Sequence, residues 1–225
     1  MDTNGGDFKF FCYLCTMKRM ILTFLCLLTV CANAQTFTID TISDAVFQRM
    51  AGKSYKANCT VKRSELRYLR LSHYDGSGKE VVGELVCNKS IANDLKEIFQ
   101  VLYSNKYPIE RMQLIDDFDA DDERSMQANN TSCFNFRPIA GSKKLSAHSR
   151  GMAIDINPLY NPCVKRRKDG SLLVQPKTAR KYVDRSKKGR YAIHQNDLCY
   201  QLFVKHGFKW GGAWNTLKDY QHFER

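Results

Sequence analysis

Two stretches far apart in the chain carry the side chains that are able to do chemistry. The first contains His148 and Asp155, with Gly151 between them, and the second contains Asp219 and His222. Imidazole and carboxylate groups are what proteins use to hold a catalytic zinc, with three protein ligands and one open position. The residue types therefore indicate a metal site formed by His148, Asp155 and His222, with Asp219 as a carboxylate beside it.

The sequence around Asp155 also favours a ligand role. Asp155 lies between Ile154 and Ile156, in a segment that is expected to be a buried strand. A buried carboxylate is costly unless it is paired or binds a metal. Asp219 lies close enough to His222 in the sequence for both to face one water molecule if the segment turns. Each spacing alone is close to noise, so the prediction depends on the two stretches together.

Both stretches belong to longer motifs, and these motifs resemble a known family. The chain reads Ser-Ala-His-Ser-Arg-Gly-Met-Ala-Ile-Asp-Ile over 146–156, and Trp-Gly-Gly-Ala-Trp over 210–214 precedes Asp-Tyr-Gln-His-Phe-Glu. These residues resemble the zinc peptidases of the D-alanyl-D-alanine carboxypeptidase and dipeptidase family. That family includes L-alanyl-D-glutamate endopeptidases, and its fold is also used by hedgehog signalling domains. The resemblance covers residues 130–225.

The resemblance implies a role for each residue. It implies that His148, Asp155 and His222 bind zinc (Zn2+). It implies that Asp219 is the general base, which takes a proton from the attacking water and returns it to the leaving amine. It also implies an arginine that steadies the substrate and the developing negative charge. Arg137 is the candidate, although the family's usual Ser-Gly-Tyr-Arg-Ser motif is replaced here by Phe-Asn-Phe-Arg-Pro.

Further side chains near the motifs are candidates for supporting or substrate-binding roles. Ser146 is expected to support the site by hydrogen bonding, with a plain loop serine as the alternative. Trp210 and Trp214 are expected to wall the cleft, with core positions as the alternative. Glu224 either orients a ligand histidine or is a surface charge. Three histidines are expected at the surface or at helix ends rather than on a metal: His73, His194 and His206.

The first 34 residues are expected to be an export signal, and 35–225 the folded protein. Met-Lys-Arg-Met begins at Met17, an apolar run of about ten residues follows, and Ala-Asn-Ala offers a cleavage site after Ala34. The run is shorter than the roughly 20 residues that span a bilayer. Residues 1–16 are interpreted as a mis-called extension. An uncleaved membrane anchor and lipid attachment at Cys31 are the alternatives, and only this segment is expected to contact a membrane.

Charge and cysteine content set further limits. Removal of the signal takes away three basic and two acidic residues and lowers the net charge from +12 to +11. A basic exported protein suits anionic partners such as cell-wall glycan, acidic lipid or nucleic acid. A solvated basic surface is preferred to a nucleic-acid site, because no motif for stacking on bases or reading a groove is present. No Cys-x-x-Cys pair follows residue 34, so a structural cysteine zinc site is not expected. An odd number of cysteines remains, which leaves at least one thiol free or paired between chains: Cys59, Cys87, Cys133, Cys163 and Cys199. A disulfide between Cys133 and Cys163 is one option.

The chain beyond the signal is expected to be one α+β domain, a small antiparallel sheet with packed helices, resembling the hedgehog and DD-peptidase fold. A β-hairpin is expected to reverse at Asp75–Gly78. Residues 163–192 are basic and weakly patterned, so a long surface excursion is expected there. A short helical lead-in is expected over 35–60, where Ile42, Val46, Phe47 and Met50 have helical spacing. Further helices are expected from an N-cap at Ser90 to 102, over 121–128, and from an N-cap at Asn196 to Gly207. Short strands are expected over 109–115, 152–156, 208–211 and 220–223.

The sequence thus predicts an exported zinc metallopeptidase that cleaves peptidoglycan stem peptides at bonds involving D-amino acids, in the periplasm or outside the cell. A D-Ala-D-Ala carboxypeptidase is the first expectation. A dipeptidase, or an L-Ala-D-Glu or other cell-wall endopeptidase, is the alternative within the enzymes, because pocket shape decides which bond is cut. A zinc-bearing wall-binding module without turnover is the alternative outside them, and Asp219 beside His222 argues against it.

Overall fold

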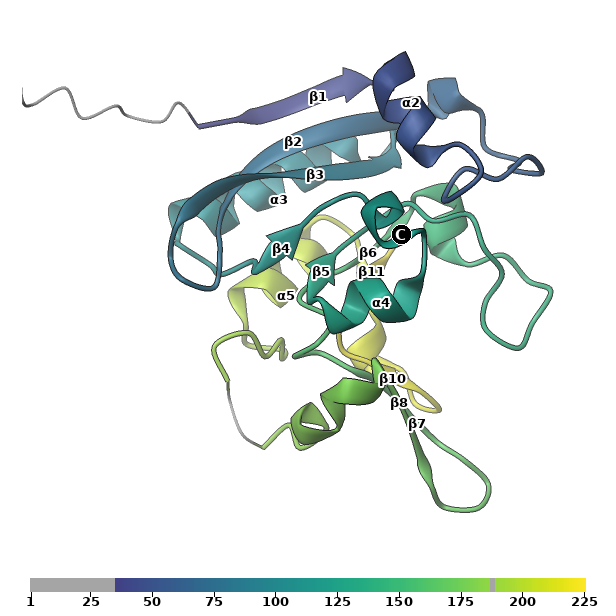
Figure 1. Cartoon of the computed structure of the whole chain (residues 1–225). Coiled ribbons are helices and arrows are strands. Elements are labelled where there is room, and N and C mark those ends of the chain that lie inside the picture. Colours follow the sequence, from purple (N-terminus) through teal and green to yellow (C-terminus); the bar gives the residue numbers. More distant parts are fainter. Residues whose placement is uncertain (1–34, 187–188) are drawn as a thin grey trace, which may run out of the picture. The chain divides into compact units, whose positions relative to one another are not determined.

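The computed structural model describes residues 35–186 and 189–225. The expected export signal, its apolar run and Cys31 lie outside the described residues. The chain divides into two units, 1–35 and 36–225, and the second holds all the helices and strands described (Figure 1). Among the described residues, no helix has the length and apolar character needed to cross a membrane.

The described elements alternate between short helices and short strands. In order they are β1 (Phe37–Thr41), α2 (Asp44–Met50), η1 (Arg63–Glu65), β2 (Leu66–Tyr74), β3 (Glu80–Asn88), α3 (Ala92–Ser104), β4 (Arg111–Met112), η2 (Ile115–Phe118), α4 (Asp122–Gln127), β5 (Asn130–Thr131), η3 (Ala147–Arg150), β6 (Ala153–Asp155), β7 (Cys163–Arg166), β8 (Leu172–Gln175), η4 (Lys177–Tyr182), α5 (Leu198–Lys205), β9 (Lys209–Trp210), η5 (Gly211–Ala213), β10 (Lys218–Asp219) and β11 (His222–Glu224). The fold is α+β, as the sequence predicts.

The largest sheet has the strand order β1-β2-β3, and all its pairs are antiparallel. The β2–β3 hairpin confirms the predicted reversal. Asp75 closes it because its Oδ1 accepts hydrogen bonds from the amides of Ser77 at 2.8 Å and Lys79 at 3.0 Å. The start of the described chain differs from the expectation, since Phe37–Thr41 pairs with β2 as a strand before helix α2 begins.

Helix α3 covers this sheet with the predicted apolar stripe, which is fully buried. Both predicted N-caps are wrong by one residue. Ile91 occupies the N-cap position of α3, while the Ser90 hydroxyl donates to Asn88 Oδ1 at 2.9 Å. Asp197, not Asn196, caps α5, and its carboxylate accepts from the amide of Cys199 at 2.8 Å. Local sequence shows a capping residue type but not which of two polar neighbours faces the helix.

The second half of the chain forms two small antiparallel sheets, β6-β11-β9 and β10-β7-β8. The segment 163–192 lies largely at the surface, as expected, but it also contains the β7–β8 hairpin and η4, which the sequence did not predict. Strand β7 forms by pairing with the distant β10, and local periodicity does not reveal such a partner. The expected strand over 109–115 is reduced to Arg111–Met112, which pairs in parallel with β5.

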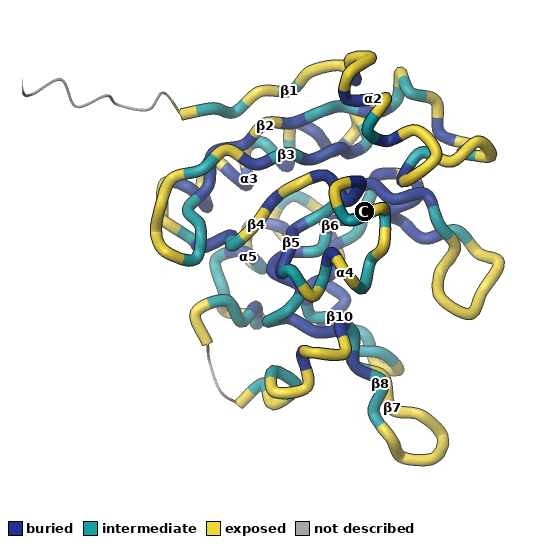
Figure 2. Tube along the Cα trace, viewed as in Figure 1, coloured by how far each residue is buried: buried dark blue, intermediate teal, exposed yellow. Residues whose placement is uncertain are grey.

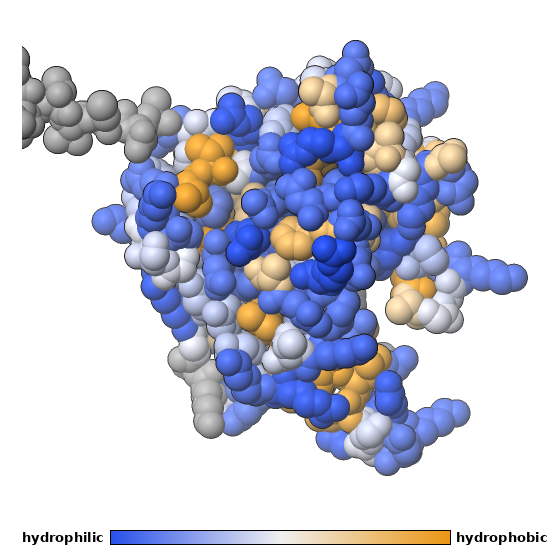
Figure 3. Space-filling model, in the orientation of Figure 1, coloured by the Kyte–Doolittle hydropathy of each residue, from blue (hydrophilic) through white to orange (hydrophobic). Residues whose placement is uncertain are grey.

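The main core lies between the β1-β2-β3 sheet, α3, α5 and the β6-β11-β9 sheet. Figure 2 shows buried stretches along β2 and β3, whereas the edge strand β1 is mostly exposed. The tip of the β7–β8 hairpin is also exposed. The face drawn in Figure 3 is largely hydrophilic, with small, separate apolar areas.

His73 is buried in strand β2 at 3% exposure, so its expected surface position is wrong. All five cysteines of the described residues are free thiols, and the Cys133–Cys163 disulfide is not formed.

Candidate metal centre

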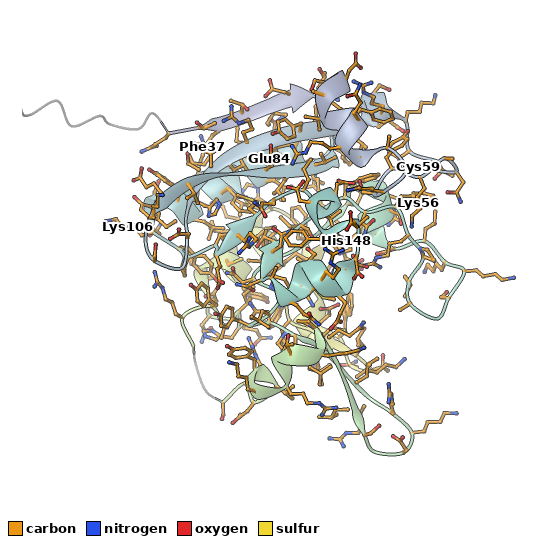
Figure 4. The ribbon with its side chains drawn as sticks, viewed as in Figure 1. Phe37, Lys56, Cys59, Glu84, Lys106 and His148 are labelled. Carbon is orange, nitrogen blue, oxygen red and sulfur yellow. The ribbon has the colours of Figure 1, made fainter. Side chains whose placement is uncertain are left out.

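His148 is presented by the short helix η3, whose ends explain its position. Ser146 occupies the N-cap, and its hydroxyl accepts from the His148 amide at 3.3 Å. Gly151 ends the turn with φ of +66°, and a Cβ there would lie 2.6 Å from the amide nitrogen of Asn88. Only glycine fits this left-handed, closely packed position. Figure 4 shows His148 among the elements of the domain, and its side chain is buried.

Asp155 and His222 meet because strands β6 and β11 pair. The antiparallel register places His222 directly opposite Asp155, and Phe223 opposite Ile154. Side chains at directly opposed positions project to the same face of a sheet. The pairing therefore brings together two residues that are 67 positions apart in the sequence. Asp155 is also anchored by its backbone, which exchanges hydrogen bonds with Ser132 at 2.9 and 3.2 Å.

Three polar atoms converge at this point. His148 Nε2 lies 3.2 Å from His222 Nδ1 and 3.3 Å from Asp155 Oδ2, and His222 Nδ1 lies 3.0 Å from Asp155 Oδ1. His148, Asp155 and His222 are the group of described residues in which one ligand atom from each can surround a metal ion. The structure thus brings together the three residues that the sequence predicted to be metal ligands.

The outer nitrogen of each imidazole fixes which nitrogen faces the centre. His148 Nδ1 lies 2.6 Å from the carbonyl oxygen of Cys133, and His222 Nε2 lies 3.3 Å from Glu224 Oε2. A carbonyl or carboxylate can only accept, so each outer nitrogen carries the proton in the neutral ring. Both inner nitrogens then present lone pairs toward a carboxylate. Partners of this kind are the usual second layer of a metal site, and the arrangement fits a cation better than a set of mutual hydrogen bonds.

The electrostatics of the cluster also indicate that a positive charge stabilises the buried Asp155 carboxylate. Burial opposes ionisation of Asp155, but the charge of His148 and the hydrogen bonds from both histidines hold its pKa well below the usual range. Burial likewise opposes protonation of His222, yet its hydrogen bonds to Asp155 and Glu224 raise its pKa to about 10. A carboxylate kept ionised in a buried position needs a cation beside it, and a metal ion or a proton on His222 supplies one.

Asp219 lies next to this cluster on the short strand β10. Its Oδ1 is buried and has no hydrogen-bond partner among the described residues. Burial raises the pKa of Asp219 to about 6, and the neighbouring charge of His222 opposes that rise. Strand β10 pairs with β7 so that Cys163 is directly opposite Asp219, and the neighbouring Asp219 charge adds to burial in raising the pKa of the Cys163 thiol. A carboxylate with this pKa is suited to exchanging a proton near neutral pH.

The two tryptophans have different positions. Trp214 is half-buried, and its ring centroid lies 5.3 Å from that of His222, so it borders the cluster as expected. Trp210 belongs to the core, and its indole N–H donates to the carbonyl of Tyr220 at 2.9 Å. Trp210 therefore anchors the segment that carries His222. Its position agrees with the core alternative and not with a place in the wall of the cleft. Ser146 is buried and acts through the turn that holds His148.

Arg137 is not joined to the cluster. Its guanidinium forms an ion pair with Asp122, and its backbone bonds to Ser149 and Ser146. Within residues 35–186 and 189–225, no hydrogen bond or ion pair connects Arg137 to the three ligands. The structure does not support a direct role in charge stabilisation for this residue.

The expected position of His206 at a helix end is confirmed, because His206 is the C-cap of α5, and its Nδ1 lies 3.1 Å from Asp94 Oδ1.

Several residues of the site escape sequence reasoning. The Cys133 carbonyl, Cys163 and Gly211 all contact site residues through chain segments that local patterns do not connect. A Cβ on Gly211 would lie 2.7 Å from the Asp219 carbonyl oxygen and 2.9 Å from Asp219 Cβ. The Gly-Gly pair in the Trp-Gly-Gly-Ala-Trp motif was the available signal for such a close approach. Glu224 was considered from sequence, and its contact with His222 agrees with an orienting role.

Comparison with known proteins agrees with this geometry. Residues 140–225 match the family model described as D-alanyl-D-alanine carboxypeptidase. Searches of the curated proteins and of the solved structures gave no match. The matched segment contains all three clustered ligands together with Asp219. Residues 140–225 of the chain are therefore similar to the D-alanyl-D-alanine carboxypeptidase family of peptidases.

Proposed function

We propose that the protein is an exported zinc metallopeptidase that hydrolyses peptidoglycan stem peptides at bonds involving D-amino acids, as a D-Ala-D-Ala carboxypeptidase. The observation that carries the proposal is the convergence of His148, Asp155 and His222 beside the buried carboxylate of Asp219. The family match over the same residues supports a peptidase.

Zinc fits this donor set. Ligand atoms about 2.0–2.1 Å from a tetrahedral zinc lie about 3.3 Å from one another. The three inner atoms of the cluster are separated by 3.0–3.3 Å. Two imidazole nitrogens and one carboxylate are also a ligand combination of catalytic zinc sites, which keep one position open. When bound, the metal supplies a water of lowered pKa and polarises the scissile carbonyl.

Asp219 performs the proton transfers in the proposed reaction. Its unpartnered Oδ1 accepts a proton from the attacking water, and the same carboxyl group then donates a proton to the leaving amine. The carbonyl oxygen of Cys133 can only accept, so Nδ1–H of His148 donates to it and Nε2 of His148 keeps its lone pair. Glu224 gives His222 the same constraint. Trp214 borders the cluster and offers an apolar wall to the substrate.

The charge of the protein suits such a substrate. The chain has a net charge of +12, and the exposed tip of the β7–β8 hairpin carries consecutive basic residues. Stem peptides end in a carboxylate, and a basic surface raises the local concentration of anions. Export and a location in the periplasm or outside the cell remain part of this proposal.

The test is digestion of purified muropeptides by the zinc-loaded protein, with products identified by mass. Release of one terminal D-alanine is expected. Release of the D-Ala-D-Ala pair would instead assign a dipeptidase, and an internal fragment would assign an endopeptidase. Asp219→Ala should lower kcat by about 10²–10⁴-fold while zinc stays bound. If the zinc-loaded wild type cleaves no muropeptide, the peptidase proposal fails, and a non-catalytic wall-binding module takes its place.

A further inference from the structure

The carboxylate of Asp219 has a thiol beside it. Cys163 begins strand β7, and the antiparallel pairing of β7 with β10 places Cys163 directly opposite Asp219. Directly opposed residues in such a pair have Cβ atoms about 4.5–5.5 Å apart, within reach of a side-chain contact. The pairing therefore places the thiol and the carboxylate side by side, where each affects the pKa of the other. The ionised carboxylate can only accept, so the S–H group is the donor.

We propose that Cys163 is a positioning residue for Asp219, whose S–H group donates to the carboxylate and fixes the orientation in which it faces the metal cluster. The kinetic consequence of this contact rests on the proposed peptidase function. The contact itself does not.

The surroundings of Asp219 show why its orientation depends on this donor. Oδ1 is buried without a partner among the described residues, so nothing else polar holds that end of the carboxylate. Gly211 packs behind it, where an added Cβ would lie 2.9 Å from Asp219 Cβ. Close packing restricts the Cβ, but it does not select a rotation of the terminal carboxylate, which is a broad torsion. A donor at one oxygen selects that rotation and leaves the other oxygen for a proton.

A thiol is chemically suited to orient a base while weakening it only slightly, since the interaction with Cys163 is the smallest of the effects that lower the pKa of Asp219. The S–H group is a weak donor, whereas an arginine or lysine would favour the ionised carboxylate strongly and lower its basicity. Burial and the nearby Asp219 charge raise the pKa of the Cys163 thiol, so it remains protonated and keeps its donor. A protonated thiol is also a poor nucleophile, which suits a free cysteine in an exported protein.

The kinetic test compares Cys163→Ala and Cys163→Ser, with Cys59→Ala as the matched control. Cys59 is also a half-buried free thiol and lies outside the site. Cys163→Ala should lower kcat about 10-fold with KM and bound zinc unchanged, and Cys163→Ser should recover most of that loss because its hydroxyl donates. An unchanged kcat in Cys163→Ala, an equal loss in both variants, or loss of zinc would overturn the proposal.

A double-mutant cycle tests the contact without using activity. Unfolding in urea is measured for the wild type, Cys163→Ala, Asp219→Ala and the double variant at one zinc concentration. A coupling of about fivefold in the unfolding equilibrium constant is expected, and its absence would refute the hydrogen bond. If the wild type proves inactive on muropeptides, only the proposed function fails, and this cycle still decides the contact. If Cys163→Ala does not fold, Cys163→Val replaces it, because valine fills the space and cannot donate.

Discussion

Replacing Gly211 by alanine should damage the site through a close approach that the structure measures. The added Cβ would lie 2.7 Å from the Asp219 carbonyl oxygen, 2.9 Å from Asp219 Cβ and 3.3 Å from His222 Cβ. Ordinary van der Waals contact begins at 3.4 Å. The Asp219 atoms must therefore move by about 0.5–0.7 Å, whereas His222 needs a much smaller shift.

The direction of that movement sets the expected result. Strand β11 is held on both sides, by β6 and β9, whereas among the described residues β10 pairs only with β7. Strand β10 should therefore take most of the displacement. Overpacking of this kind costs about 1–3 kcal/mol, or a decrease in Tm of about 4–8 °C for a chain of this size near the middle of that range. A shift of this size at the catalytic base should lower kcat about 10-fold or more. Zinc affinity should fall less than kcat, because His222 moves less than Asp219.

The assay for Gly211→Ala combines thermal unfolding, zinc titration and muropeptide hydrolysis. Gly189→Ala is the matched control, since a Cβ at Gly189 meets nothing within 4 Å. The control should match the wild type in all three measurements. If Gly211→Ala keeps the wild-type Tm and kcat, then the segment around Asp219 moves without loss of stability or activity, and the prediction from close packing is wrong.

Three further predictions concern the metal and the scaffold. Glu224→Gln should weaken zinc binding about 10–100-fold, because its contact with His222 orients that ligand; an unchanged affinity by calorimetry would show that Glu224 is a surface charge. Zinc at about 100 times its Kd should stabilise the chelator-treated protein by about 2.7 kcal/mol, raising Tm by about 5–10 °C, and a similar rise in His148→Ala would contradict the ligand assignment. Glu84, whose pKa is lowered by its hydrogen bonds with Arg49, should add stability above its unfolded pKa and lose it as the pH falls through its lower folded value. Glu84→Gln should remove that pH dependence in urea unfolding, and an unchanged profile would exclude the pair as its source.

The sequence by itself determined the chemistry of the site and the elements that have a strong local signal. The residue types and motif spacing predicted the ligands His148, Asp155 and His222, which the structure brings together. The apolar stripe of α3 and the turn at Asp75–Gly78 also predicted their elements correctly, because periodicity and turn residues act over a few positions. The same local signals failed at helix ends, where Ser90 and Asn196 each lie one residue from the observed N-cap.

Only the tertiary structure decided how the site is completed. Pairing of β6 with β11 sets Asp155 opposite His222, and pairing of β7 with β10 sets Cys163 opposite Asp219. A strand register joins residues far apart in the chain, so no local pattern encodes it. The fold likewise places Trp210 in the core and pairs Arg137 with Asp122. Packing between distant segments, rather than residue type, determines which of the candidate side chains converge at the candidate metal site.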